Sequence, residues 1–317
     1  MASSPTSELS AGLARVLGVS RVESLRRLTG GASRETWRFE ADGNDFVLQR
    51  VRPGRPDGLG CEPAVLSSAF AAGVPVPEVV VDGSLSTELE LPFMIVRAVE
   101  GETIARKILR DEEFAHARTV LADQLGTAAA KLHSIDHSHI AGLASNDQLT
   151  MYRKVLDDLG EPHPVFEIAF RWLESNRPTS GMVALVHGDY RLGNVMVNAE
   201  GLTAILDWEL AHVGDPMEDL AWLCVRAWRF GGAFPVAGMG TYQQLFSAYE
   251  RASGVQPDPD VVRWWEILGT LKWGIMCIAQ ANTHLSGVAR SHELAAIGRR
   301  VCENEYDILT MLREVLV

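Results

Sequence analysis

The sequence predicts an α+β protein built from two lobes, and three observations indicate this. At roughly 150 residues per domain, a length of 317 residues favours two units. Alternating runs typical of β-strands are concentrated in the first hundred residues, whereas the remainder has apolar residues at helical spacing. We therefore expect a small, β-rich N-terminal lobe over residues 1–98 and a larger, mostly helical C-terminal lobe over residues 99–317.

The N-terminal lobe is expected to contain a hairpin, a helix and a further strand. The runs Thr36–Glu40 and Phe46–Val51 flank an Asp-Gly-Asn-Asp turn, which is typical of a β-hairpin. After a Pro- and Gly-rich loop, the Ala- and Leu-rich segment from about Glu62 to Ala72 predicts a helix. The apolar run Pro92–Val96 predicts a strand that leads to the junction between the lobes, at residues 97–101.

The composition excludes several classes of partner. With 29 basic and 41 acidic residues, the formal net charge is −12, so neither nucleic acid nor an anionic membrane surface is an expected partner. The four cysteines form no C-x-x-C pair and are expected to be reduced, mostly buried thiols. The N-terminus lacks the pattern of a signal peptide, and no helical apolar run is long enough to span a bilayer. We therefore expect a cytoplasmic protein.

A second predicted hairpin brings polar residues together. Two short strands, joined by a turn near residues 199–200, follow a loop that contains Asp189. Antiparallel pairing about that turn places Asn194 opposite Leu206, beside Asp207. A carboxamide and a carboxylate are therefore expected to meet at the open end of the hairpin, with a second carboxylate in the preceding loop.

This set of side chains suits phosphoryl transfer. Carboxylate and amide oxygens are ligands for Mg²⁺, and a loop carboxylate can orient a hydroxyl and accept its proton. His187, Asp189 and Asn194 have the H-x-D-x-x-x-x-N spacing of protein kinases, in which a later Asp completes the metal site, as Asp207 would here. A simple Asx-turn at Asp189 is the alternative, but the spacing, the hairpin and the metal chemistry agree with each other.

The two motifs together resemble a known family. The segment LVHGDYRLGNVMV, followed by ILDWELAHVGDPMEDLAWL, is similar to the aminoglycoside phosphotransferase family of the protein-kinase-like superfamily, in particular to kinase-like domains found alongside acyl-CoA dehydrogenases. The resemblance runs from about Leu28 to the C-terminal helices. It implies a bilobal protein-kinase-like fold, ATP and Mg²⁺ in the cleft, and phosphoryl transfer to a hydroxyl of a small molecule.

The resemblance also implies roles for individual residues. By motif match, Asp189 would be the catalytic base, and Asn194 and Asp207 would hold Mg²⁺. His187 would be structural, fixing the catalytic loop, and Arg191 would line the phosphate or substrate side.

The segment after this motif predicts a helix start. Asp215 as N-cap, Pro216 at the first helical position and Glu218 at the third form a capping box. Asp219 follows in the first turn, where the resemblance implies that its carboxylate anchors the backbone of the catalytic loop. The alternative is a favourable charge near the positive end of the helix dipole.

The segment before the first hairpin is where the resemblance places a phosphate-covering loop. Gly30, Gly31 and Ser33 are small enough for backbone N–H groups to approach phosphate oxygens. No Gly-Lys dipeptide occurs in the chain, which excludes a P-loop NTPase.

The strand that follows departs from the family pattern. Gln49 occupies the position at which a Lys or Arg should bind the α- and β-phosphates, and strand alternation directs the next residue, Arg50, to the opposite face. Three explanations stay open: a bulge turns Arg50 inward, Gln49 contributes a neutral hydrogen bond, or a different cation serves. Glu62 matches the helix Glu that pairs with the missing Lys, although it also reads as an exposed helix-start residue.

The adenine pocket and the acceptor site have weaker signals. Backbone groups from Arg97 to Val99 match the hinge that would bind adenine, and Val47, Met94 and Val96 would line the base pocket or form lobe core. Tryptophans are frequent in the C-terminal region, and their helical stripe is more typical of core than of a pocket. Glu266 and Glu293 are isolated, so a polycationic aminoglycoside is not the expected acceptor.

The sequence therefore predicts an ATP- and Mg²⁺-dependent small-molecule O-kinase. A hydroxylated acyl-CoA, an amino alcohol, a sugar or an antibiotic stays open as acceptor, as do ATP or GTP as donor and a monomer or homodimer. Because of Gln49, a pseudokinase-like module that binds a nucleotide or metabolite without catalysis is the alternative.

Overall fold

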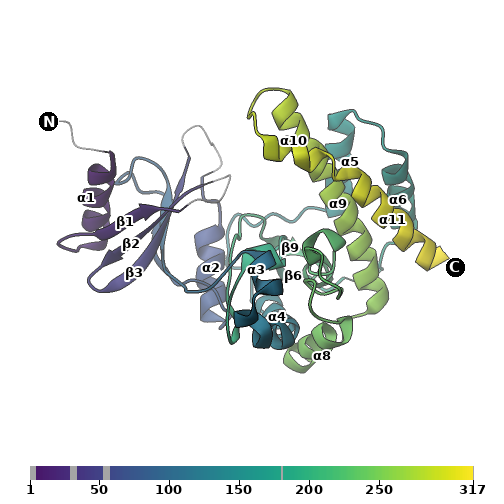
Figure 1. The fold of residues 1–317 in the computed structure, drawn as a ribbon, viewed down its shortest axis with the longest axis horizontal. Helices are drawn as coiled ribbons and strands as arrows, with labels where there is room; N and C mark the ends of the chain where they lie inside the picture. Colours follow the sequence, from purple (N-terminus) through teal and green to yellow (C-terminus); the bar gives the residue numbers. More distant parts are fainter. Residues whose placement is uncertain (1–4, 29–33, 53–57, 180, 317) are drawn as a thin grey trace.

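The N-terminal part of the chain forms a five-stranded antiparallel sheet. The structure is a computed structural model, and it describes residues 5–28, 34–52, 58–179 and 181–316. The order of strands in the sheet is β1-β2-β3-β5-β4. Figure 1 labels the first three of these strands. Their bounds are β1 Glu23–Arg27, β2 Arg34–Ala41, β3 Asn44–Val51, β4 Val79–Gly83 and β5 Phe93–Arg97.

The hairpin β2–β3 confirms the first predicted strand pair. Its turn contains Asp42 and Gly43, both with positive φ (47° and 73°), as a two-residue hairpin turn of the primed type requires. The register pairs Thr36 with Gln49 and Glu35 with Arg50 without a bulge, so the side chains of Gln49 and Arg50 point to opposite faces. A bulge that turns Arg50 inward is therefore excluded.

The two faces of the sheet pack against different helices. Phe93 and Ile95 lie in a core with α1 (Pro5–Leu17), whereas Met94 and Val96 lie in the large core shared with α2 (Glu62–Ala71) and the helical region. Met94 and Val96 are therefore core residues, and the half-buried Val47 is the one of the three candidates still open enough to touch a base.

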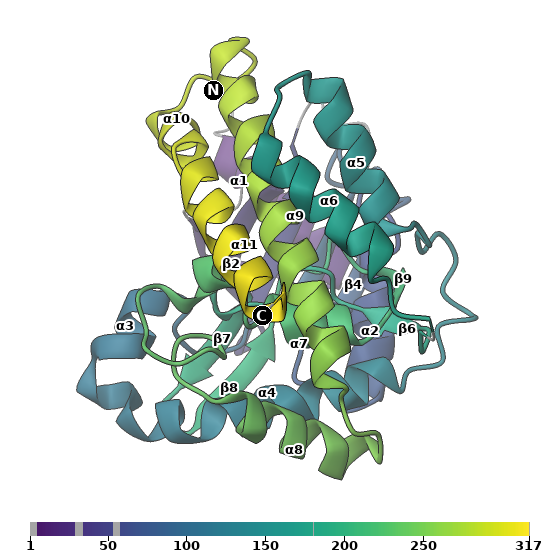
Figure 2. The same ribbon diagram turned by 90° about the vertical axis from the view of Figure 1, so that its right-hand side faces the viewer.

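The rest of the chain is mostly helical and is organised around one long helix, α9 (Pro259–Leu285). It packs against α7 (Met217–Trp222), α5 (Gln148–Leu159), α6 (Pro164–Ser175), α10 (His292–Gly298) and α11 (Val301–Leu316). Figure 2 shows α9 between the pair α5 and α6 and the pair α10 and α11. The remaining elements are α3 Ala105–Arg110, α4 Ala115–His133, α8 Tyr242–Ser253, β6 Ala184–Val186, β7 Val195–Asn198, β8 Gly201–Ile205, β9 His212–Gly214 and three short 3₁₀ helices, at Glu112–Phe114, Leu192–Asn194 and Arg226–Arg229.

The apolar stripe of α9 is core, as the more common interpretation predicts. Trp264, Leu268, Leu271 and Ile275 are buried in one cluster with side chains from α5, α6 and α11. The four cysteines are free thiols; Cys224 and Cys277 are buried and Cys302 is exposed. Over the described residues, no helix has the length and apolar character needed to cross a membrane.

The segment between the sheet and the helical region is fixed to the second hairpin. Glu102 and Val197 exchange backbone hydrogen bonds of 2.8 and 3.0 Å, so the linker lies against β7. Gly101 has φ of 154° at this crossing, and an added Cβ would lie 2.9 Å from Thr203 Oγ1 and 3.2 Å from the backbone of Val197. Only a glycine fits this backbone and this close approach.

We predict that Gly101→Ala destabilises the protein by about 2–4 kcal/mol, through backbone strain and forced contact. Gly254→Ala is the matched control, because Gly254 also has positive φ (75°) but no atom near its added Cβ. The control should cost only about 1–2 kcal/mol of backbone strain. Urea unfolding of both variants measures the difference, and equal losses would contradict a steric role for Gly101.

Candidate active site

The second hairpin brings together the polar residues that the sequence predicts. β7 and β8 pair Val195 with Ile205, and the N–H of Leu206 donates to the carbonyl of Asn194 over 2.8 Å. This is the predicted register, and it places Asp207 directly beyond the open end of the hairpin. Asp189 lies in the loop between β6 and the short 3₁₀ helix Leu192–Asn194.

The carboxylate of Asp189 accepts hydrogen bonds from three side chains. Asn194 Nδ2 donates to Oδ2 over 2.5 Å, and Arg191 Nε lies 2.9 and 3.2 Å from the two oxygens. The third donor is Trp222 Nε1, 2.7 Å from Oδ1. Nothing in the sequence pattern marks Trp222 as a site residue, because it is one of several tryptophans in the C-terminal region.

The side-chain oxygen of Asn194 is suited to bind a cation. Its Nδ2 donates both to the Asp189 carboxylate and, over 3.0 Å, to the Asp189 carbonyl, which leaves Oδ1 as the free end of the amide. Asn194 and Asp207 then offer two oxygen donors, the number typical of Mg²⁺ sites that substrate phosphates complete. The described residues contain no group of three His, Cys, Asp or Glu side chains arranged for a metal.

Asp207 lies in a crowded, negatively charged part of the site. Its φ is 67°, a left-handed conformation that is uncommon for a residue other than glycine. Desolvation by the surrounding protein and repulsion from Glu209, Asp189 and Glu62 raise the pKa of Asp207 to about 6. The residue is still exposed to solvent, so a cation can reach it. The accumulated negative charge favours binding of that cation.

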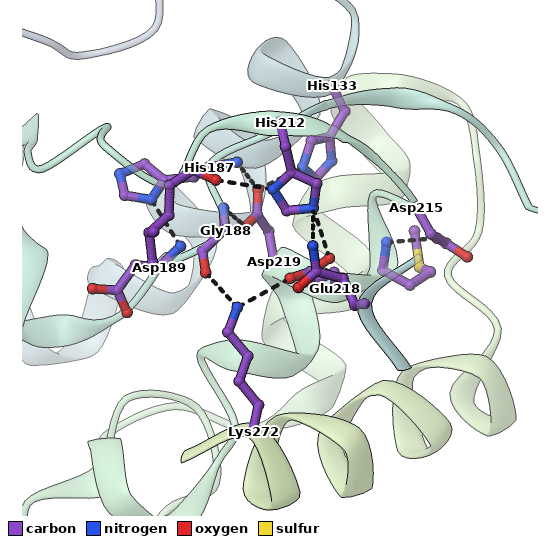
Figure 3. A network of polar contacts seen from close by, with 12 residues as sticks. His133, His187, Gly188, Asp189, His212, Asp215, Glu218, Asp219 and Lys272 are labelled. Atoms are coloured by element: carbon purple, nitrogen blue, oxygen red, sulfur yellow. Dashed lines mark hydrogen bonds and ion pairs between the residues drawn. The ribbon is translucent and has the colours of Figure 1, made fainter. Parts of the chain in front are cut away.

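A buried carboxylate holds the backbone of the catalytic loop. Asp219 is fully buried, and its oxygens accept from the N–H groups of His187 (2.7 Å) and Gly188 (3.0 Å) (Figure 3). His133 Nε2 lies 3.1 Å from Asp219 Oδ2. Although burial raises the pKa of an acid, the hydrogen bonds and charge of His133 hold the pKa of Asp219 below its usual value.

His187 links the loop of Asp189 to the segment after β8 that carries Asp207. Its ring is completely buried, which lowers the pKa of the imidazole and keeps it neutral. Nδ1 accepts from the N–H of Asp189 over 3.2 Å, so the ring proton lies on Nε2, which donates to Leu206 O over 3.0 Å. The ring therefore connects the backbone of Asp189 to that of Leu206.

A second buried network comes from α9. Lys272 Nζ donates to the carbonyl of Gly188 over 3.0 Å and lies 3.3 Å from Glu218 Oε1 (Figure 3). Burial alone would lower the pKa of Lys272, but Glu218 and further negative groups raise it. Glu218 also accepts from His212 over 3.2 Å. Lys272 was not a predicted site residue, because nothing local marks it.

The predicted capping box at the start of α7 is wrong. The helix begins at Met217 with Pro216 as its N-cap, so Asp215 is not the N-cap and Pro216 is not the first helical residue. Asp215 Oδ1 accepts from the N–H of Met217 over 2.9 Å, in the turn before the helix. The side chain of Glu218, however, turns inward to Lys272 and His212 rather than back to Asp215. A charged partner inside the protein outcompetes a local cap.

A different cation, Arg34, lies next to Gln49, the residue at the position where the sequence lacks a lysine. Arg34, at the start of β2, forms an ion pair with Glu62 on α2, and its Nη1 donates to Gln49 Oε1 over 3.3 Å. The side chains of Arg34 and Glu62 are 12% and 5% exposed, so the pair is largely shielded from water. Glu62 is therefore not an exposed helix-start residue.

The candidate Arg50 is corrected by the same geometry. Its guanidinium donates to Glu35 Oε2 over 2.8 Å and to Leu89 O over 3.4 Å, on the face of the sheet opposite Gln49. Strand alternation accounts for this, and Arg50 does not approach Glu62.

The structure describes only some of the other predicted nucleotide contacts. Gly30, Gly31 and Ser33 lie outside the described residues. At the expected hinge, the N–H of Arg97 donates to Glu78 O (2.9 Å) and that of Ala98 to Asp45 O (3.0 Å). Within the described chain, the N–H of Val99 is thus the hinge donor that no other group binds.

Arg191 connects Asp189 to an aromatic cluster. Its guanidinium carbon lies 4.6 Å from the ring centre of Trp228, which packs against Trp222, Trp273 and Phe230. Phe230 lines a cavity of about 670 Å³ with apolar side chains that include Leu109, Phe234 and Met239. The Arg191 guanidinium and the rings of Trp228 and Phe230 therefore join the loop of Asp189 to this cavity, whose lining also includes Arg110 and Arg118.

We predict that Asp207→Asn stabilises the metal-free protein near pH 7. A carboxylate whose pKa rises on folding binds its proton more tightly in the native state, so its ionisation between about pH 4 and 6 destabilises the fold. Solvent screens this exposed group, so the gain should be no more than about 1 kcal/mol.

Thermal unfolding of wild type and Asp207→Asn, in EDTA from pH 4 to 8, checks this expectation. The difference in Tm should vanish as the pH falls through the range from 6 to 4. A variant that is less stable than wild type at pH 7 would contradict the proposed repulsion.

Comparison with known proteins agrees with this geometry. The model of the phosphotransferase enzyme family matches residues 24–265. "Acyl-CoA dehydrogenase family member 11" of Gallus gallus is 25% identical over 90% of this chain, which spans 40% of that protein's length. "Hygromycin-B 4-O-kinase" of Escherichia coli is 26% identical over 63% of this chain and 61% of its own.

Solved structures show the same fold. An aminoglycoside phosphotransferase-like protein of Ralstonia eutropha superposes with a TM-score of 0.80 over 98% of both chains at 20% identity. An aminoglycoside phosphotransferase bound to AMP-PNP and hygromycin B superposes with a TM-score of 0.66 over 96% of this chain and 98% of its own, at 17% identity. These likenesses confirm the bilobal protein-kinase-like fold, and the family match over more than half of the sequence shows that the chain belongs to the phosphotransferase enzyme family.

Proposed function

We propose that this protein is an ATP- and Mg²⁺-dependent phosphotransferase that acts on a hydroxyl group of a small molecule. The observation that carries the proposal is the convergence of Asp189, Asn194 and Asp207 at the open end of one hairpin. Membership of the phosphotransferase family supports the reaction class. We also propose residues 1–98 and 99–317 as the two lobes, since the chain leaves the sheet after Arg97.

Each residue has a distinct part in the proposed reaction. Asp189 orients the acceptor hydroxyl and takes its proton as the acceptor oxygen bonds to the γ-phosphorus and the bond to the nucleoside diphosphate breaks. Asn194 and Asp207 hold Mg²⁺, which neutralises charge on the β- and γ-phosphates when it is bound. Asp219 and His187 fix the loop and do not touch the reactants.

The nucleotide is proposed to lie between the sheet and the hairpin. The neighbouring structures include complexes with AMP-PNP, ADP and GDP, which supports a nucleoside triphosphate as donor. Val99 N–H is the expected hinge donor to the base, and Val47 is the expected apolar contact. Gly30, Gly31 and Ser33 are the expected phosphate-covering residues.

Arg34 is proposed to supply the cation that Gln49 cannot. Thr36 lies directly opposite Gln49, and Arg34 is two residues from Thr36, so Arg34 and Gln49 share a face of the sheet. The ion pair with Glu62 holds the guanidinium there, as the helix Glu does for a lysine. This arrangement weakens the case for a binding module without catalysis, which rested on the missing charge.

The acceptor is proposed to be partly apolar. Glu266, one of the two isolated acids, is buried and already bound by Arg229 and Tyr242, so it offers no free charge to a polycation. The cavity beside Phe230 is lined by apolar side chains, by the polar Thr241 and Gln244, and by Arg110 and Arg118, whose positive charges disfavour a polycation. A molecule with an apolar portion and one reactive hydroxyl fits this lining better than an aminoglycoside.

Thermal unfolding with Mg-ATP, Mg-GTP, and ATP plus EDTA tests the nucleotide site. A ligand at 100 times its Kd should stabilise by about 2.7 kcal/mol and raise Tm by a few degrees. Asp207→Ala should lose the Mg²⁺-dependent shift in Tm, whereas Asp189→Ala should keep it. In a separate assay of ADP release from ATP, Asp189→Ala should be inactive. Equal loss of both properties in both variants would contradict the assigned roles.

We predict that Arg34→Gln weakens Mg-ATP binding about 10- to 100-fold, because a charge-assisted contact contributes about 1.5–3 kcal/mol. Arg50→Gln is the matched control, since Arg50 lies on the other face of the sheet. Arg34→Lys should recover part of the affinity. Calorimetric titration of the three folded variants measures this, and unchanged affinity in Arg34→Gln would leave Gln49 as the phosphate contact.

A further inference from the structure

The indole of Trp222 makes a contact that the reaction roles above do not use. Trp222 is buried, with 2% of its surface exposed, and its Nε1–H donates to Asp189 Oδ1 over 2.7 Å. Trp222 comes from α7, far along the chain from the loop that holds Asp189. The contact therefore joins the proposed catalytic carboxylate to the interior of the helical region.

The helix α7 thus binds the catalytic loop in two ways. Asp219 accepts from the backbone of His187 and Gly188, and Trp222, three residues later, donates to the side chain of Asp189. Residues three apart on a helix lie on the same face, so one helical face fixes both the loop and its carboxylate. A movement of α7 would therefore displace the loop backbone and the Asp189 side chain together.

The ring of Trp222 is itself held tightly. Lys272 Nζ lies 4.7 Å from the ring centre while it also donates to Gly188 O. Gly269 on α9 also lies against the indole, because a Cβ added to Gly269 would lie 3.1 Å from Trp222 Cε3. The ring therefore packs directly on the backbone of α9 and has little room to rotate.

Neighbouring tryptophans show that this hydrogen bond is not a general result of burying an indole. Trp228 and Trp273 lie in the same aromatic cluster as Trp222. Their Nε1–H groups are buried and have no hydrogen-bond partner in the part of the chain that the structure describes. Within this cluster, only the indole that faces Asp189 is paired.

We propose that Trp222 is a positioning residue for phosphoryl transfer, and this inference rests on the proposed function. The terminal torsion of a carboxylate is broad, so Asp189 needs fixed donors to hold one orientation. Arg191 is more exposed, at 23%, and its charge is also attracted to the phosphates of a bound nucleotide. Trp222 is neutral and fixed, so it holds Oδ1 when Arg191 turns toward the phosphates.

Trp222→Phe, with Trp273→Phe as its control, tests the proposal. Both variants remove one N–H and part of one buried ring from the same cluster. Rates of ADP release from Mg-ATP are measured with water and with screened hydroxyl compounds as acceptors. We expect kcat to fall about 10- to 100-fold in Trp222→Phe, with KM for ATP and Tm close to those of Trp273→Phe.

A spectroscopic readout tests the contact in a protein whose tryptophans are all intact. In ¹⁵N-tryptophan-labelled Asp189→Ala, the indole N–H signal of Trp222 should shift and exchange faster with solvent than in wild type. The signal of Trp264, which lies in a different core cluster and donates to Leu173 O over 2.9 Å, should stay in place. This measurement applies even where Trp222→Phe does not fold.

The outcomes separate the inference from the function it rests on. A wild type that turns over while Trp222→Phe keeps its kcat overturns the positioning role and leaves the proposed function intact. An unmoved Trp222 signal in Asp189→Ala overturns the hydrogen bond. A wild type that binds Mg-ATP but transfers its phosphoryl group to no acceptor, water included, contradicts the proposed function and the role of Trp222 with it.

Discussion

The active-site arrangement depends on the buried carboxylate of Asp219. An isolated charge inside a protein costs several kcal/mol, and here three donors offset that cost: two backbone N–H groups of the catalytic loop and the ring of His133. Because the carboxylate is stable only when the loop donates to it, the loop has one favourable conformation. The position of Asp189 follows from that conformation, since it comes directly after the two bound residues.

The helical region acts as the rigid support of this loop. Lys272 on α9 donates to the carbonyl of Gly188. Asp219 on α7 accepts from the N–H groups of His187 and Gly188 in the same turn. Glu218 on α7 joins the two helices by accepting from Lys272, and it also accepts from His212 on β9. Donors and acceptors of the turn are thus both satisfied from inside the protein, which is what a buried backbone segment requires.

The sequence predicts the parts of this site that depend on local pattern. The hairpin, its register, the place of Asp207 and the role of Asp219 follow from strand alternation, a turn and a motif match over a short stretch. Trp222, Lys272 and the Arg34–Glu62 pair were missed, because their partners lie 28 to 84 residues away in the chain. The capping box failed for the same reason: the local partner of Glu218 lost to a distant lysine.

In the proposed nucleotide site, Arg34 on β2 takes the role of the cation that β3 lacks. A phosphate is bound by charge at a point in space, and two paired strands offer more than one residue from which a long side chain reaches that point. The register puts Arg34 diagonally across from Gln49 on the same face of the sheet. The ion pair with Glu62 holds the guanidinium of Arg34 there. Gln49 accepts a hydrogen bond from Arg34 and helps to hold it, so the proposed site compensates for the neutral residue on β3 with a charge on β2.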